Sequence, residues 1–170
     1  LDGKPGNGFH INISVNANDG SDQLYHMIAG ILSKVKEMTA FLNPTEESYK
    51  RFGVDKAPKY ISWSSENRSQ LIRIPAAVGE YRRAELRSPD PTANPYLAFA
   101  LMIYAGLYGI ENKLTMPEAA DINLYKADSK TLANYKTLPN NLSSACAIAT
   151  ASDFIRSHIP TSILDIYCSK

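Results

Sequence analysis

The sequence predicts an α+β fold in which a small antiparallel sheet packs against helices. Three observations support this prediction: residues 8–15 alternate apolar and polar side chains, residues 23–41 carry apolar side chains at helical spacing, and Asn94-Pro95 begins a second helical segment. The 170 residues are 44% hydrophobic and 21% charged, which is close to average globular usage. We therefore expect residues 1–170 to form one domain around a sizeable core.

Four short segments supply the strands of the predicted sheet. Residues 8–15 have the period-two pattern of a half-buried strand, with Phe9, Ile11 and Ile13 on one face and His10, Asn12 and Ser14 on the other. The first face is apolar, and the second carries polar side chains that are able to bind ligands. Residues 60–63, 70–75 and 81–87 are also typical of strands, and an antiparallel sheet is their simplest assembly.

Two long helices are predicted. The first covers residues 23–41 and ends before an Asn-Pro pair. The second begins at Asn94, an N-cap, followed by Pro95 at the first helical position, and runs to about Glu111. Its apolar run is shorter than the roughly 20 residues that a bilayer requires, so we expect a buried helix and no membrane span. Shorter helical pieces are predicted over residues 142–148 and 153–158.

Composition narrows the function classes. Lysine plus arginine total 18 and aspartate plus glutamate total 17, so bulk charge does not favour a nucleic-acid partner. Cys146 and Cys168 lack metal-ligand spacing and are too few for a disulfide framework, which fits a reducing cytoplasm. Residues 1–8 show neither a secretory signal nor an initiator methionine. We therefore expect a cytoplasmic protein of which this chain is an excised piece.

Charged residues alternate along residues 83–87. A strand would place Arg83, Glu85 and Arg87 on one face and the residues between them on the other. For an isolated strand, a solvated salt-bridge stripe is the ordinary interpretation. His10, on the polar face of the first strand, is a candidate metal ligand together with Glu85, although a lone histidine is more often structural. Mg²⁺ or Mn²⁺ prefers about six donors, so water or further residues must complete such a site.

Arginines concentrate in the first half of the chain. Their planar, permanently charged groups suit phosphate and carboxylate oxygens, so in a nearly neutral protein they indicate a polyanionic ligand, such as ATP together with a second acid. An RNA-binding surface would need exposed aromatic residues between the arginines, and the sequence offers few. Five of these arginines are the candidates for such a ligand: Arg51, Arg68, Arg73, Arg83 and Arg87.

Four motifs occur in one order along the chain. They are Gly6-Asn7-Gly8-Phe9-His10; Asn43-Pro44-Thr45 with Ser48-Tyr49-Lys50-Arg51; Asn67-Arg68-Ser69 with Ile72-Arg73-Ile74-Pro75; and Arg82-Arg83-Ala84-Glu85-Leu86-Arg87-Ser88-Pro89-Asp90-Pro91 with Ala93-Asn94-Pro95-Tyr96-Leu97. Together they resemble bacterial-type glutamine synthetases, from the carboxyl-terminal part of the catalytic domain. The resemblance is strong from Gly6 to Lys113 and weaker beyond, where Tyr125 and the two residues before it are also similar.

The resemblance implies a reaction and a set of contacts. ATP phosphorylates the side chain of glutamate, and ammonia then displaces phosphate from the acyl phosphate. By resemblance, His10 and Glu85 hold Mg²⁺ or Mn²⁺, which neutralises the transferred phosphoryl group. Arg51 and Arg68 are the catalytic residues that it implies. The implied glutamate contacts are Gly6, Arg51 and Arg87, and the implied ATP contacts are Ser14, Arg68, Arg73 and Arg83.

Some positions depart from the family pattern. Asn12 stands where the family has a second histidine, and Lys56 stands where it has a flap glutamate that helps deprotonate ammonium. A cation at that position weakens ammonium binding, and Asp55 would substitute only in a rearranged loop. The family's amino-terminal domain and most of its metal-binding glutamates have no counterpart in this chain. We therefore expect the isolated chain to be inactive. The resemblance also implies that the intact parent is a ring-shaped homo-oligomer.

Two alternatives remain open at the level of sequence. A γ-glutamyl ligase that uses an amine other than ammonia would share the scaffold and the ATP chemistry, and Lys56 keeps this alternative open. A noncatalytic module that retains the fold for assembly or regulation would lack metal and nucleotide binding.

Overall fold

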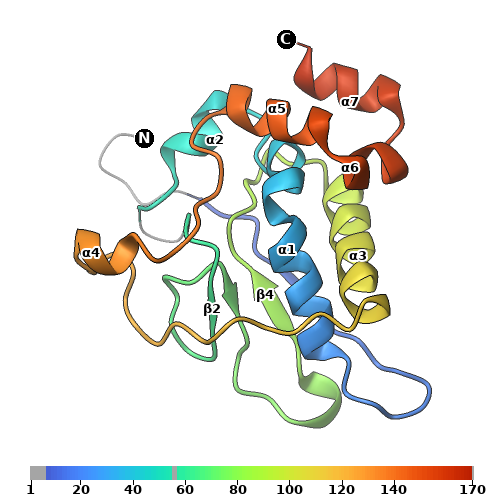
Figure 1. The fold of residues 1–170 in the computed structure, drawn as a ribbon, viewed down its shortest axis with the longest axis vertical. Helices are drawn as coiled ribbons and strands as arrows, with labels where there is room; N and C mark the ends of the chain where they lie inside the picture. The colour runs from blue at the N-terminus through green and yellow to red at the C-terminus, as the bar shows by residue number, and fades with distance from the viewer. Residues whose placement is uncertain (1–6, 55–56, 170) are drawn as a thin grey trace.

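A computed structural model describes residues 7–54 and 57–169. Within these residues, one sheet contains β1 (Ile11–Ile13), β2 (Trp63–Ser64), β3 (Ile72–Arg73) and β4 (Ala84–Leu86), in the order β1-β4-β3-β2. Two long helices, α1 (Leu24–Leu42) and α3 (Pro95–Glu111), run antiparallel and pack against each other beside the sheet (Figure 1). The predicted α+β class is confirmed.

The sheet is mixed, whereas the sequence predicts a wholly antiparallel one. β1 pairs with β4 and β4 with β3 in antiparallel fashion, but β2 and β3 are parallel. Residues 65–71 connect these two strands. At the start of this loop, the Ser64 hydroxyl accepts hydrogen bonds from the backbone N–H groups of Glu66 and Asn67. The Asn67 side chain in turn accepts one from the N–H of Ser69. These bonds hold the loop that returns the chain to the beginning of β2, so β3 runs parallel to β2.

Both long helices lie where the sequence predicts them. α1 is shifted by one residue at each end, and α3 has the predicted bounds. The expectation that α3 is a buried helix is wrong, because only one side packs against the core and large apolar side chains such as Tyr96 and Ile103 are exposed. The Asn94 side chain accepts hydrogen bonds from the N–H groups of Tyr96 and Leu97 at 3.0 and 3.3 Å. These N–H groups have no acceptor inside the helix, so the cap stabilises its first turn.

Glycines set the distance between α1 and α3. A Cβ atom on Gly30 of α1 would lie 2.1 Å from the carbonyl oxygen of Ala105 and 2.6 Å from the backbone nitrogen of Gly109. A Cβ atom on Gly109 would lie 2.1 Å from the carbonyl oxygen of His26. No real Cβ atom fits at such distances, so the two backbones touch only because both positions lack side chains.

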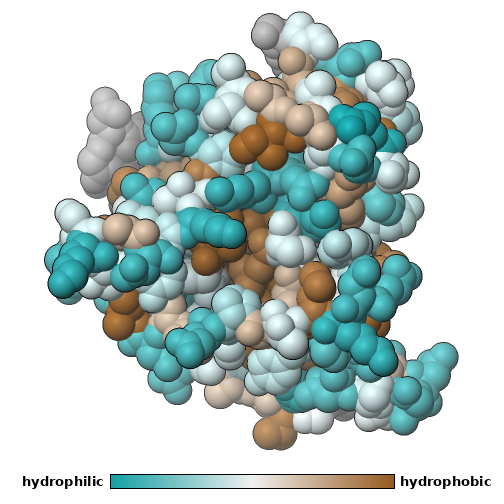
Figure 2. All heavy atoms as spheres, viewed as in Figure 1, coloured by the Kyte–Doolittle hydropathy of each residue, from teal (hydrophilic) through white to brown (hydrophobic). Residues whose placement is uncertain are grey.

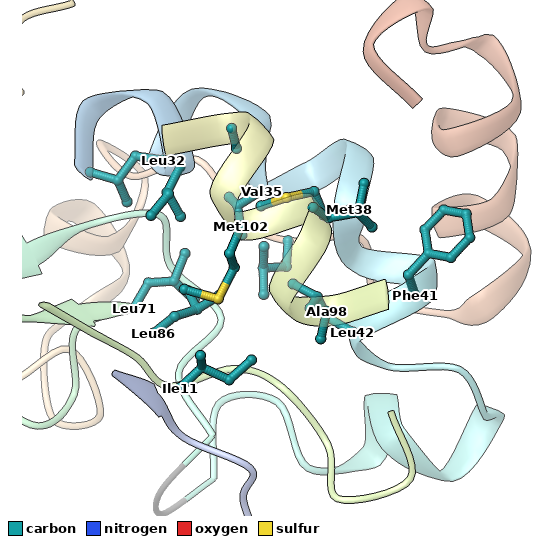
Figure 3. Close-up of a cluster of buried hydrophobic side chains, with 14 of the residues drawn as sticks. Ile11, Leu32, Val35, Met38, Phe41, Leu42, Leu71, Leu86, Ala98 and Met102 are labelled. Atoms are coloured by element: carbon teal, nitrogen blue, oxygen red, sulfur yellow. The ribbon is translucent and has the colours of Figure 1, made fainter. Parts of the chain in front are cut away.

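The core lies between the helices and one face of the sheet (Figure 3). Met102 of α3 reaches Leu71 and Leu86, and all three side chains are buried together with Ile11 of β1. Because Leu86 points into this core, the side chain of Glu85, the residue before it, points to the opposite face of the sheet. The packing of Leu86 in the core therefore decides which face of β4 carries the charged side chain of Glu85.

The remaining elements are short. The structure contains a 3₁₀ helix (Gly79–Tyr81), α2 (Glu46–Lys50), α4 (Ser129–Leu132), α5 (Leu142–Ala151), α6 (Asp153–His158) and α7 (Thr161–Cys168). α5 and α6 confirm the predicted helical pieces, and with α7 they gather at the carboxyl-terminal end of α1 (Figure 1). Figure 2 shows hydrophilic residues over much of one face, with hydrophobic residues exposed between them. Among the described residues, no helix has the length and hydropathy of a bilayer span.

Candidate active site

Glu85 forms the centre of a charged cluster on the face of the sheet that points away from the helices. Its Oε2 accepts hydrogen bonds from Arg73 Nε of β3 at 2.8 Å and from Arg87 Nη1 at 3.1 Å. Its Oε1 lies 3.2 Å from His10 Nδ1, just before β1. The antiparallel register places Arg73 and Asn12 directly opposite Glu85 on the two neighbouring strands. Three strands therefore bring these groups together.

The centre of the cluster is buried, in contrast to the solvated stripe that an isolated strand would form, whereas His10 and Arg73 are partly exposed. Glu85 is 8% exposed and Arg87 is 4% exposed. Burial raises the pKa of Glu85, but the hydrogen bond from Arg73 and the charges of Arg87 and Arg73 outweigh it, so the pKa lies below its usual value. The carboxylate is therefore ionised at neutral pH and faces two guanidinium groups.

The His10–Glu85 pair is suited to a divalent cation. Two ligands at about 2.1 Å from a Mg²⁺-like ion and at right angles to each other would lie about 3 Å apart, close to the observed 3.2 Å. Gly8 leaves room for the ring, since a Cβ atom there would lie 2.7 Å from His10 Nε2. Within the described ranges, no group of three or more His, Cys, Asp or Glu side chains could hold a metal. His10 and Glu85 would therefore supply two of the roughly six donors that such a cation prefers.

Arg51 lies in a second buried arrangement. Its Nη1 is 3.0 Å from Asp90 Oδ2, and its Nε donates a hydrogen bond to the carbonyl oxygen of Asn7 at 2.7 Å. Asn7 follows Gly6, which is outside the described residues. Asp90 belongs to the fourth sequence motif, but the residue pattern alone gives it no role. Its contact with Arg51 is the signal that sequence reasoning missed.

The other predicted ATP contacts lie at the edges of the cluster. Arg68 is exposed, and its carbonyl oxygen accepts a hydrogen bond from Arg87 Nε at 3.2 Å. Arg83 is exposed and donates to the carbonyl oxygen of Tyr81 at 3.1 Å. Ser14 is exposed directly after β1. The structure thus joins His10, Arg73, Glu85 and Arg87, and leaves these three side chains accessible beside them.

The family model described as glutamine synthetase, catalytic domain, matches residues 1–170. The chain belongs to this family. It is 40% identical to glutamine synthetase of Methanosarcina mazei, over 100% of this chain and 42% of that protein. It is 43% identical to glutamine synthetase of Methanocaldococcus jannaschii, over 84% of this chain and 35% of that protein. The sequence-based assignment to the glutamine synthetase family is confirmed.

Two solved structures have a similar fold. The GmaS/ADP complex in conformation 1 has a TM-score of 0.81 and 29% identity, and it is matched over 95% of this chain and 41% of that chain. Apo GmaS without ligand has a TM-score of 0.76 and 29% identity. The chain therefore spans less than half the length of the glutamine synthetases and of the GmaS chain that it resembles.

Proposed function

We propose that the protein carrying this chain is a glutamine synthetase that joins ammonia to the side-chain carboxylate of glutamate through an acyl phosphate, at the expense of ATP. The observation that carries this proposal is the cluster of His10, Arg73, Glu85 and Arg87, buried at Glu85 and Arg87, in a chain of this family. The family implies ATP and a divalent metal, and we propose Mg²⁺ or Mn²⁺. We also propose a cytoplasmic homo-oligomeric ring, of which this chain forms the carboxyl-terminal part of the catalytic domain.

His10 and Glu85 would hold the metal, through one imidazole nitrogen and one carboxylate oxygen. When bound there, a divalent cation supplies positive charge that stabilises the transferred phosphoryl group. Arg73 and Arg87 orient the Glu85 carboxylate, so it presents Oε1 on the side of His10. A ligand held in this way needs little reorganisation during the reaction.

The arginines around the cluster would bind the anionic parts of the substrates. Arg68, Arg73 and Arg83, with Ser14, are proposed for ATP, because phosphoryl transfer develops charge on oxygens that guanidinium groups match well. Gly6, Arg51 and Arg87 are proposed for the carboxylates of glutamate. Arg68 and Arg51 are the proposed catalytic residues, one on each substrate.

The test is a steady-state assay of the full-length protein with glutamate, ammonium and ATP. We expect glutamine and inorganic phosphate in equal amounts, with no phosphate release when glutamate is omitted and no reaction after treatment with a chelator. Phosphate and a different amide product, seen only when another amine replaces ammonium, would contradict the proposed acceptor. Nucleotide and metal binding without any amide product would contradict the proposed reaction.

Lys56 gives a prediction that depends on sequence only, because it lies outside the described residues. If the loop that carries it approaches the site, as the family's flap does, ammonium meets a cation there. At about 4 Å and an effective dielectric near 20, the repulsion is about 4 kcal/mol. We therefore expect Lys56→Glu to lower the KM for ammonium and leave the KM for ATP nearly unchanged. Kinetics with ammonium varied at saturating ATP and glutamate measure this, and an unchanged ammonium KM would place Lys56 outside the ammonium site.

A further inference from the structure

The guanidinium of Arg51 is almost fully engaged by the protein. Its side chain is 10% exposed. Besides Asp90 and the Asn7 carbonyl, it contacts Asn43 Oδ1 and the Ser88 carbonyl oxygen from Nη1, at the longer distances of 3.4 and 3.5 Å. From Nη2 it makes one contact, to the Pro89 carbonyl oxygen at 3.4 Å. Among the described residues, the second Nη2 hydrogen has no protein acceptor, which leaves one donor on this guanidinium.

Asp90 is the anionic partner that the structure gives this guanidinium, and it is itself held in place. It is 6% exposed. Its Oδ1 accepts hydrogen bonds from the backbone N–H and the hydroxyl of Thr92, at 2.8 and 2.5 Å. Its own N–H donates to the carbonyl oxygen of Leu42, the last residue of α1, at 2.9 Å. The carboxylate therefore has one orientation, with Oδ2 toward Arg51.

The contact between Arg51 and Asp90 joins two buried groups of opposite charge. Burial lowers the pKa of Arg51, and the charge and hydrogen bond of Asp90 raise it and offset part of that effect. A buried cation that loses its only anionic partner is strongly disfavoured and turns toward water or other acceptors. The orientation of the guanidinium therefore depends on Asp90 more than on the long contacts with carbonyl oxygens.

Arg51 in turn connects two parts of the site. Its Nε holds the carbonyl of Asn7, and the N–H of Phe9 donates to the Pro89 carbonyl oxygen at 2.9 Å. These bonds fasten residues 7–9, which lead directly to His10, against the segment that contains Asp90. A shift of Arg51 would therefore disturb the approach to the metal-ligand pair as well as the free Nη2 donor.

We propose that Asp90 is a positioning residue: it fixes the Arg51 guanidinium so that one Nη2 hydrogen points to the substrate carboxylate while Nε secures residues 7–9. The role in glutamate binding rests on the proposed function, and the role in securing residues 7–9 does not.

The kinetic test uses Asp90→Asn in the full-length protein, since asparagine keeps the shape and removes the charge. We expect the glutamate KM to rise about tenfold, because a small displacement of a positioning group costs binding of this order. The ATP KM should stay within about twofold. In an Arg51→Lys background, adding Asp90→Asn should change the glutamate KM by less than about twofold, since coupled residues are not additive. Asp153→Asn, which removes an exposed Asp–Arg pair on α6, is the matched control and should change neither constant.

Hydrogen exchange provides a readout that is independent of the reaction. In Asp90→Asn, the Phe9 amide should exchange faster, whereas amides in the middle of α1 should exchange at the wild-type rate. Wild-type exchange at Phe9, an unchanged glutamate KM, or equal increases in the KM values for glutamate and ATP would each overturn the proposed role of Asp90. If the wild-type protein shows no glutamate-dependent turnover, the proposed function fails, and the exchange result still decides whether Asp90 positions Arg51.

Discussion

Replacing Glu85 by alanine in the full-length protein is expected to lower kcat/KM by about 10²–10³-fold, because preorganised charge stabilisation is usually the largest catalytic term. The substitution removes a proposed metal ligand and leaves Arg73 and Arg87 without their carboxylate. Arg87 is buried, so the uncompensated charge should also destabilise the fold by about 3 kcal/mol. Steady-state kinetics at saturating metal and urea unfolding measure the two effects separately.

Glu85→Gln is the matched control for shape. The amide keeps the volume and one acceptor oxygen for the arginines, but it is a weak metal ligand and carries no charge. We expect it to lose nearly as much activity as alanine and to lose less stability. Near-normal turnover of Glu85→Gln at saturating metal would mean that the cluster is structural, and that His10 and Glu85 do not form a metal site.

Gly30→Ala is expected to destabilise the protein by about 2 kcal/mol or more. In an exposed helix interior the same change stabilises by up to about 1 kcal/mol, because glycine is a poor helix former. Here the new Cβ atom would lie 2.1 Å from a backbone carbonyl oxygen of α3, and overpacking of this kind forces the backbones apart at a cost of about 1–3 kcal/mol. Urea unfolding of the variant and the parent gives the difference, and its sign is the informative result.

Gly106→Ala in α3 separates helix propensity from backbone contact. Its Cβ atom would meet Cγ of the buried Met27 side chain at 2.7 Å, whereas a Cβ atom on Gly30 would meet the backbone of α3 at 2.1 Å. Because a side chain can adjust more easily than a backbone, we expect Gly106→Ala to cost about 1 kcal/mol, less than Gly30→Ala. Equal effects at the two positions, or a stabilising Gly30→Ala, would show that α1 and α3 do not make the close contact described above.

Local chemistry explains what the sequence predicts well. The Asn94-Pro95 start of α3 depends on a side chain that reaches N–H groups only two and three residues away, and the alternation around Glu85 is a property of any extended strand. The four motifs identify the family because each is a short run of consecutive residues. The sequence therefore determined the fold class, both long helices, and the set of charged residues from which the site is built.

Contacts between distant residues were decided only by the tertiary structure. The parallel pairing of β2 with β3 depends on a loop held by Ser64 and Asn67, and residue alternation carries no information about strand direction. The joining of His10 to Glu85 and of Arg51 to Asp90 depends on strand register and on where α1 ends. Burial, too, is a property of packing: the stripe from Arg83 to Arg87 would be solvated on an isolated strand, and becomes a buried ion cluster at Glu85 and Arg87 because Leu86 is drawn into the core.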